Sequence, residues 1–133
     1  MKKSGAHMNR LVIKIGTSVL LDEKKRISTG RIGDIARQVR KVKEKGIDVI
    51  IVSSGAIGCG METIGLVRKP KEIAKRQALA SIGQVLLMKM YRENFEKKGM
   101  KVGQILLNHE DIKNRTRCLN LTNTLDTLLK MDI

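Results

Sequence analysis

The sequence contains very few aromatic, cysteine and proline residues. Tyr91 and Phe95 are its only aromatic side chains, which leaves almost no surface on which nucleic-acid bases could stack. Cys59 and Cys118 form neither a CxxC pair nor a metal-ligand pattern with the two histidines. A single proline and the lack of low-complexity tracts argue against a disordered chain. We therefore expect a folded, reduced, cytoplasmic protein without a metal site of its own.

The sequence also lacks a long apolar segment. Residues 47–61 form the longest run with little charge, but this run includes Asp48 and several Gly and Ser residues, so it is too short and too polar to span a bilayer. The basic start is followed by polar residues, which argues against a signal peptide. We expect residues 1–8 to be disordered or a cloning remnant, and we expect no membrane partner.

Acidic residues are scarce relative to basic ones. The chain has 133 residues, of which 27 are Lys or Arg and 13 are Asp or Glu, and its formal charge is +14. Such an excess attracts polyanions, including nucleic acids and nucleotide phosphates. The basic residues are spread over several expected helices, as on solvated faces. A non-catalytic module that binds anions or nucleic acid stays open, although the missing aromatics weigh against nucleic acid as the main partner.

The first half of the chain alternates strand and helix patterns. Residues 11–15 predict a strand, and residues 28–45 predict a helix that begins at Ser28 or Thr29 and stops at Gly46. Residues 48–54 predict a second strand, and its uninterrupted Val and Ile run is typical of a strand covered on both faces. The glycine-rich residues 55–60 predict a turn or a short helix. The helix's apolar positions are Ile32, Ile35, Ala36, Val39 and Val42.

The second half predicts a long helix over residues 71–98, a third strand over residues 101–107 and a last helix over residues 119–131, after a polar stretch at 108–117. The resulting order, β-α-β-α-α-β-α, predicts an α/β fold: a three-layer α/β/α sandwich with a mainly parallel sheet, of which the chain would hold about three strands. The apolar positions of the long helix are Ile73, Ala74, Ala78, Ile82, Val85, Leu86, Met90 and Phe95.

Polar features follow each expected strand. They are Lys14 with residues 16–18, then residues 53–56, then the loop that begins at Asn108. Ligands of such sheets bind at the carboxyl ends of the strands, and loops of Gly, Ser and Thr offer N–H groups and hydroxyls to a phosphate or carboxylate. For one loop alone, glycines that only let the chain turn remain an alternative. Two loops at adjacent strand ends favour an anion site.

The known nucleotide motifs are absent. Gly55 and Gly60 have the spacing of a P-loop, but Met61 and Glu62 replace the required Lys-[ST], and the dinucleotide fingerprint lacks its third glycine. Lys14 is costly in an apolar strand unless its amine reaches solvent or an anion, so it is either a phosphate ligand or an ordinary snorkelling lysine. No nucleophile elbow surrounds residues 53–54, so their hydroxyls are interpreted as hydrogen-bonding ligands.

Three segments carry a resemblance to a known family. Residues 12–20 (VIKIGTSVL), 52–57 (VSSGAI) and 82–84 (IGQ) resemble, in order and spacing, the amino-acid kinase superfamily and within it the glutamate 5-kinases. The likeness covers about residues 10–133, so we expect residues 9–133 to be the N-terminal portion of an amino-acid kinase domain. The kinase half of fused pyrroline-5-carboxylate synthases shares this likeness. Other kinases of the superfamily, acting on small acids or phosphates, share the first-strand lysine and loop and remain an alternative.

The resemblance implies a function. It implies ATP-dependent phosphorylation of the L-glutamate side-chain carboxylate, with Mg²⁺, as the first step of proline synthesis in a homo-oligomeric enzyme. Later family motifs, including an Asn-Glu-Asn-Asp segment and a second phosphate lysine, do not occur in these 133 residues, so we expect this chain alone to be inactive. The implied catalytic residue is Lys14; the implied ATP phosphate ligands are Lys14, Gly16, Thr17 and Gly55, and the implied substrate ligands are Ser53, Ser54 and Ala56.

Overall fold

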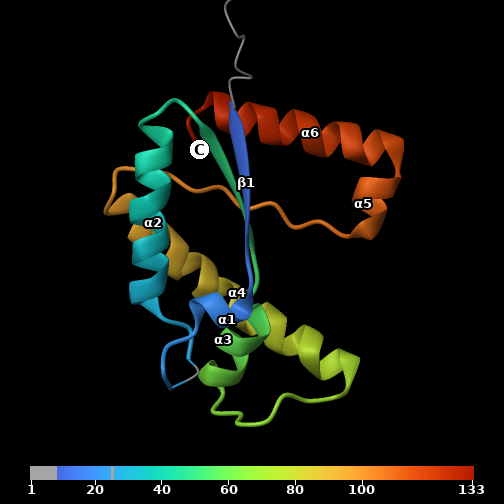
Figure 1. Cartoon of the computed structure of the whole chain (residues 1–133). Coiled ribbons are helices and arrows are strands. Elements are labelled where there is room, and N and C mark those ends of the chain that lie inside the picture. The colour runs from blue at the N-terminus through green and yellow to red at the C-terminus, as the bar shows by residue number, and fades with distance from the viewer. Residues whose placement is uncertain (1–8, 25) are drawn as a thin grey trace, which may run out of the picture.

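The structure is a computed structural model that describes residues 9–24 and 26–133 (Figure 1). The segment expected to be disordered, residues 1–8, lies outside the described residues. Two strands and six helices follow one another in the described ranges. They are β1 (Arg10–Ile15), α1 (Thr17–Leu20), α2 (Thr29–Lys43), β2 (Asp48–Ser53), α3 (Ala56–Thr63), α4 (Ile73–Glu96), α5 (His109–Lys113) and α6 (Arg115–Lys130).

The two strands form a parallel pair joined by α2. Lys14 is in register with Val52, and Ile15 with Ser53. The N-terminus of α2 is capped by Ser28, whose hydroxyl accepts a hydrogen bond from the Arg31 N–H at 3.3 Å. The chain leaves the helix through Gly46, whose φ of +75° suits glycine. The predicted β-α-β start is therefore confirmed, including the Ser28 cap, although α2 ends at Lys43, two residues earlier than predicted.

One face of the sheet packs against the core. Ile13, Ile15 and Ile51 lie on this face, and they pack with residues of α2, α3 and α4. The opposite face is more open, since Val52 keeps 49% of its surface exposed. The expectation that the second strand is covered on both faces is therefore wrong. On the open side, α6 contacts β1 near its start, where Arg10 bonds Asp126 at 2.8 Å (Figure 1).

Helices α3 and α4 pack at very short range. A Cβ added to Gly83 would lie 1.8 Å from the Ala56 carbonyl oxygen, and one added to Gly60 would lie 2.0 Å from that of Leu79. Glycine at both positions lets the two backbones touch. The contact also selects which face of α4 is buried, and that face consists of Leu79, Gly83, Leu87, Tyr91, Asn94 and Phe95.

The apolar series that predicts α4 does not coincide with its buried face. Of that series, Phe95 is buried, and Leu86 and Met90 pack against the core. In contrast, Ile73, Ile82 and Val85 are exposed, Val85 at 75%. The helix itself is confirmed. The prediction of its core-facing residues is mostly wrong because the α3 contact at Gly83 sets the rotation of the helix.

The predicted third strand is absent from the part of the chain that the structure describes. Residues 101–107 form an extended connection between α4 and α5, and Leu106 is 77% exposed. Gly103 in this connection lies against Leu128 and Ile133 at the end of α6. A strand needs a neighbouring strand for its hydrogen bonds, and this segment pairs with neither β1 nor β2. The α/β class is confirmed, but with two strands instead of three.

The helical content after residue 107 is larger than predicted. Asn108 caps α5, and Asn114 caps α6 by accepting a hydrogen bond from the Arg117 N–H at 3.1 Å. The polar stretch is therefore largely helical, and the last helix begins four residues earlier than predicted, because both asparagines act as N-caps. The short helix α1 was not predicted. Within residues 9–24 and 26–133, no helix is long and apolar enough to cross a membrane.

Candidate anion-binding site

The first two predicted loops lie side by side at the carboxyl ends of the strands. The Ser54 N–H donates a hydrogen bond to the Ile15 carbonyl oxygen at 3.1 Å, which extends the pairing of β1 and β2 by one step. Directly beyond this bond, Gly16 leads into α1 and Gly55 into α3. Parallel pairing therefore brings together two glycine-containing turns that are almost 40 residues apart in sequence.

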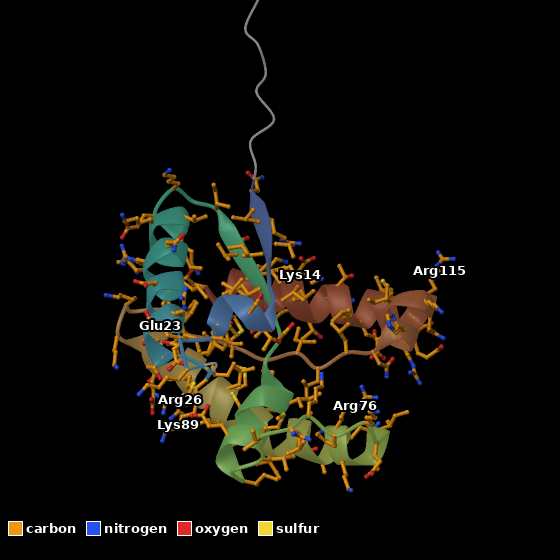
Figure 2. All side chains as sticks on the ribbon, turned by 60° about the horizontal axis from the view of Figure 1, so that its bottom comes forward. Lys14, Glu23, Arg26, Arg76, Lys89 and Arg115 are labelled. Atoms are coloured by element: carbon orange, nitrogen blue, oxygen red, sulfur yellow. The ribbon has the colours of Figure 1, made fainter. Side chains whose placement is uncertain are left out.

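Lys14 extends from the open face of the sheet. Side chains alternate along a strand, so Lys14 shares its face with Val12 of β1 and with Val52, its partner in register. All three side chains are exposed. None of the ion pairs among the described residues includes Lys14, so its ammonium group is available to an anion at the strand end (Figure 2).

Gly55 shapes the second turn. Its φ of +117° and ψ of −6° are left-handed, and an added Cβ would lie 3.2 Å from the Ile27 side chain. Gly55 is the N-cap of α3, and no side chain caps this helix. The first N–H groups of α3 thus point toward the turn without a side-chain acceptor, an arrangement that suits an anion.

The two serines before Gly55 differ in their surroundings. The Ser53 hydroxyl lies 2.8 Å from the Tyr91 hydroxyl of α4 and donates to the Ser54 carbonyl oxygen at 3.2 Å. Burial raises the pKa of Tyr91, and the bond to Ser53 partly opposes this effect. Ser54 is half-buried at the strand end. The Ser53 hydroxyl is therefore held by its bond to Tyr91 although the residue is exposed, whereas Ser54 follows the strand at the turn.

Tyr91 belongs to this site although sequence reasoning did not select it. Its signal was available in principle, because residues 79, 83, 87 and 91 are spaced by four and lie on one helical face. Tyr91 was not selected because the apolar series predicted a different buried face for α4.

The third predicted feature, the loop at Asn108, is not placed by a strand. The Asn108 side chain accepts hydrogen bonds from the N–H groups of Glu110 and Asp111, and the Asp111 carboxylate accepts from the Asn108 N–H at 2.8 Å. This capping box uses the Asn108 side chain to start α5. Because residues 101–107 are not a strand, no β pairing brings the loop to the carboxyl edge.

Neither of two hollows of the described surface includes Lys14 or Ser54. One of about 570 Å³ lies between the chain after α1 and the end of α3, and it includes Thr17 but neither Lys14 nor Ser54. Another of about 330 Å³ is lined by charged residues from Asp22 to Arg31. Within the described ranges, no three His, Cys, Asp or Glu side chains gather as metal ligands would. Lys14 and the two turns thus form one open wall.

The chain was compared with known proteins. A sequence model of the amino acid kinase family matches residues 9–133. A glutamate 5-kinase of Thermus thermophilus is 43% identical over 129 residues, which are 97% of this chain and 35% of the relative. Those of Pelobacter propionicus and Methanosarcina barkeri are 43% and 44% identical, over 92% and 95% of this chain and 33% and 35% of the relatives. The chain thus spans about a third of the length of these relatives.

Proposed function

This chain belongs to the amino acid kinase family, and from that premise we propose that it is part of a glutamate 5-kinase. Such an enzyme transfers the γ-phosphoryl group of ATP to the side-chain carboxylate of L-glutamate and forms γ-glutamyl phosphate, which begins proline synthesis. The observation that carries the proposal is the junction at Ser54, whose N–H bonds Ile15 and so joins the lysine strand to the serine turn. The similarity to glutamate 5-kinases supports glutamate as the substrate.

The proposed reaction brings two anions together. The carboxylate attacks the γ-phosphorus directly, so the protein has to align the reactants and neutralise the charge on the phosphate oxygens. We assign the ATP phosphates to Lys14 and to the turn residues Gly16, Thr17 and Gly55. We assign glutamate to Ser54, and its neighbours Ser53 and Ala56 shape the turn that holds Ser54.

Mg²⁺ enters this proposal with the nucleotide. A magnesium ion bound with ATP would neutralise charge on the phosphates, and it would need few protein ligands of its own. The turn N–H groups and the Lys14 ammonium would then complete the cradle from the protein side. The substrate is accordingly the magnesium complex of ATP.

The proposal places residues 9–133 in the N-terminal portion of an amino-acid kinase domain. The open wall fits this placement, because a phosphoryl-transfer site is closed on several sides to exclude water. We further propose that the complete protein is a cytoplasmic homo-oligomer. For the 133-residue chain alone we expect no turnover.

The test is an acyl-phosphate assay on the complete protein encoded by the reading frame that contains this chain. Hydroxylamine traps γ-glutamyl phosphate, so hydroxamate should form only when ATP and L-glutamate are both present. Lys14→Met should lower kcat/KM by about 10³-fold, because the lysine's charge would be lost from the transferring phosphate. Lys89→Met is the matched control, since Lys89 lies exposed on α4 and pairs only loosely with Glu93, at 3.8 Å (Figure 2).

Two further measurements control for loss of stability and for substrate specificity. Because Lys14 is exposed and forms no ion pair within the described ranges, Lys14→Met should leave the free energy of unfolding within about 0.5 kcal/mol of the parent. Carbamate, a nucleoside monophosphate and isopentenyl phosphate are offered as competing acceptors. Faster phosphorylation of one of these, or no glutamate-dependent product at all, would overturn the proposal.

A further inference from the structure

We propose that Tyr91 is a positioning residue that aims the Gly55 N–H group through two successive hydrogen bonds. The inference rests on the proposed function, since it assigns the aimed N–H group to the transferring phosphate. Tyr91 lies on α4, 38 residues from its partner Ser53. Its effect would pass from the helix to the turn through Ser53 and Ser54.

The direction of the hydrogen bonds follows from a proton count. The Ser53 hydroxyl has one proton, and it donates this proton to the Ser54 carbonyl oxygen at 3.2 Å. With the Ser53 proton assigned to this carbonyl, we assign Tyr91 as the donor in the 2.8 Å contact between the Ser53 and Tyr91 hydroxyl oxygens. The order is therefore Tyr91 to Ser53, and Ser53 to the Ser54 carbonyl.

The second bond fixes the direction of the next N–H group. Ser54 C=O and Gly55 N–H belong to one planar trans peptide unit, so they point in opposite directions. Holding the carbonyl toward Ser53 therefore turns the Gly55 N–H away from it. None of the hydrogen bonds found among residues 9–24 and 26–133 uses the Gly55 N–H, so it stays available to a ligand.

The two hydrogen bonds, from Tyr91 to Ser53 and from Ser53 to the Ser54 carbonyl, form what we call the relay. Its starting point, the Tyr91 side chain, is held rigidly. Tyr91 is only 5% exposed, and its ring lies beside Phe95 with the centroids 6.0 Å apart. The helix that carries it is fixed against α3 by the backbone contact at Gly83. Without this anchor, Gly55 would have the wide rotational freedom of glycine, since its left-handed conformation is one of several that it can adopt.

This arrangement predicts an effect on chemistry more than on binding. An N–H group aimed at the transferring phosphate stabilises the charge that develops there, so its misdirection lowers kcat and leaves KM little changed. Tyr91→Phe, which removes only the hydroxyl, should lower kcat about tenfold. Ser53→Ala should do the same, and the double variant should be no worse than either one, because both substitutions break the same relay.

The experiment measures kcat and KM for ATP and glutamate in the complete protein. Ser53→Thr keeps the hydroxyl and should recover most of the kcat lost in Ser53→Ala. Thr63→Val is the matched control, because it removes a part-buried hydroxyl of α3, which donates to the Cys59 carbonyl at 2.8 Å outside the relay, and its kcat should stay within about twofold. Additive losses in the double variant, or a rise in KM at unchanged kcat, would overturn the inference.

An NMR measurement separates this inference from the proposed function. In protein labelled with ¹⁵N-glycine, Tyr91→Phe and Ser53→Ala should shift the Gly55 amide resonance in the same direction, while Thr63→Val should not. If the parent protein has no glutamate kinase activity, the proposed function fails, and with it the assignment to the phosphate. If the parent is active but the Gly55 resonance and kcat do not respond to Tyr91→Phe, the relay alone is refuted.

Discussion

The thiol of Cys59 shows how burial changes the chemistry of a single residue. It is fully buried on α3, and this burial, helped by the nearby Glu62, raises the pKa of its thiol to about 11. A thiol with such a pKa is inert at neutral pH, because the reactive thiolate is almost absent. Cys118 is half-buried and also free, so thiol reagents should modify it first.

The raised pKa of Cys59 predicts a loss of stability in alkali. The unfolded thiol ionises near its ordinary pKa of 9.0 and the folded one near 11, so between these values the unfolded state binds fewer protons. Stability is therefore fully present below pH 9 and falls as pH rises toward 11. Urea unfolding should show that the parent loses roughly 1–2 kcal/mol more than Cys59→Ala over this interval. Parallel pH curves for the two proteins would contradict the prediction.

Single residues of the site differ in how visible they are in sequence. Lys14 and Gly55 could be selected because a lysine in an apolar strand and a glycine after one are locally unusual. Tyr91 could not, since its contact with Ser53 spans 38 residues and depends on the rotation of α4. The role of such a side chain depends on which face of the helix is turned toward the core. The sequence near the residue does not show this, because apolar residues at every third or fourth position are compatible with several buried faces.

At the scale of elements, the α3–α4 contact positions the proposed phosphate turn. α3 begins directly after Gly55, and Gly83 of α4 lies against the carbonyl of Ala56, the first residue of α3. The separation of the two helices therefore determines where this turn sits. Any side chain at Gly83 has to push α3 away, because the obstructing atoms are backbone atoms and cannot rotate aside.

Gly83→Ala should consequently destabilise the protein. An added Cβ would meet the Ala56 carbonyl oxygen at 1.8 Å, so the helices have to separate, and overpacking of this kind reduces the free energy of unfolding by about 2–3 kcal/mol. Urea unfolding gives the value. The control is Gly30→Ala in α2, where the new Cβ is 3.5 Å from the Ser28 hydroxyl, an ordinary contact. That substitution should be neutral or stabilising, and equal effects of the two variants would contradict the explanation.

Helices were easier to predict than strands for a physical reason. A helix forms its hydrogen bonds within one segment, so caps such as Ser28 and stops such as Gly46 determine it locally. A strand depends on a neighbour. Residues 101–107 have the apolar composition of a strand, but no strand of the described chain pairs with them. The apolar pattern of a sequence shows that a segment is able to form a strand. It does not show whether a neighbouring strand is present to pair with it.

For the molecule as a whole, the +14 charge is dispersed. The labelled basic side chains come from several parts of the chain: Lys14 from β1, Arg26 from the segment before α2, Arg76 and Lys89 from α4, and Arg115 from α6 (Figure 2). Much of the basic charge therefore acts as a general attraction for anions instead of forming one binding patch. The proposed anion site consists instead of the turns at the ends of β1 and β2 together with Lys14.

The last helix packs only loosely on the rest of the described chain. No residue of α6 is buried. Its attachments include two ion pairs, Arg10 with Asp126 at 2.8 Å and Lys43 with Asp132 at 2.6 Å, besides the contact with Gly103. Exposed ion pairs contribute only about 0–1 kcal/mol each, and salt screens them.

Hydrogen exchange should therefore show α6 opening separately from the core. Amides of α6 should exchange faster than those of α4 around Leu87, and salt should accelerate α6 more than α4. Asp126→Asn should weaken the Arg10 contact and lower the opening free energy of α6 by about 0.5 kcal/mol while leaving α4 unchanged. Asp34→Asn, which weakens the 2.7 Å pair with Arg37 inside α2, is the matched control and should not affect α6. If amides of α6 and α4 exchanged in parallel at every salt concentration, α6 would belong to the same cooperative unit as the core. The buried contacts of α3 and α4 could then not be the main source of stability of the protein.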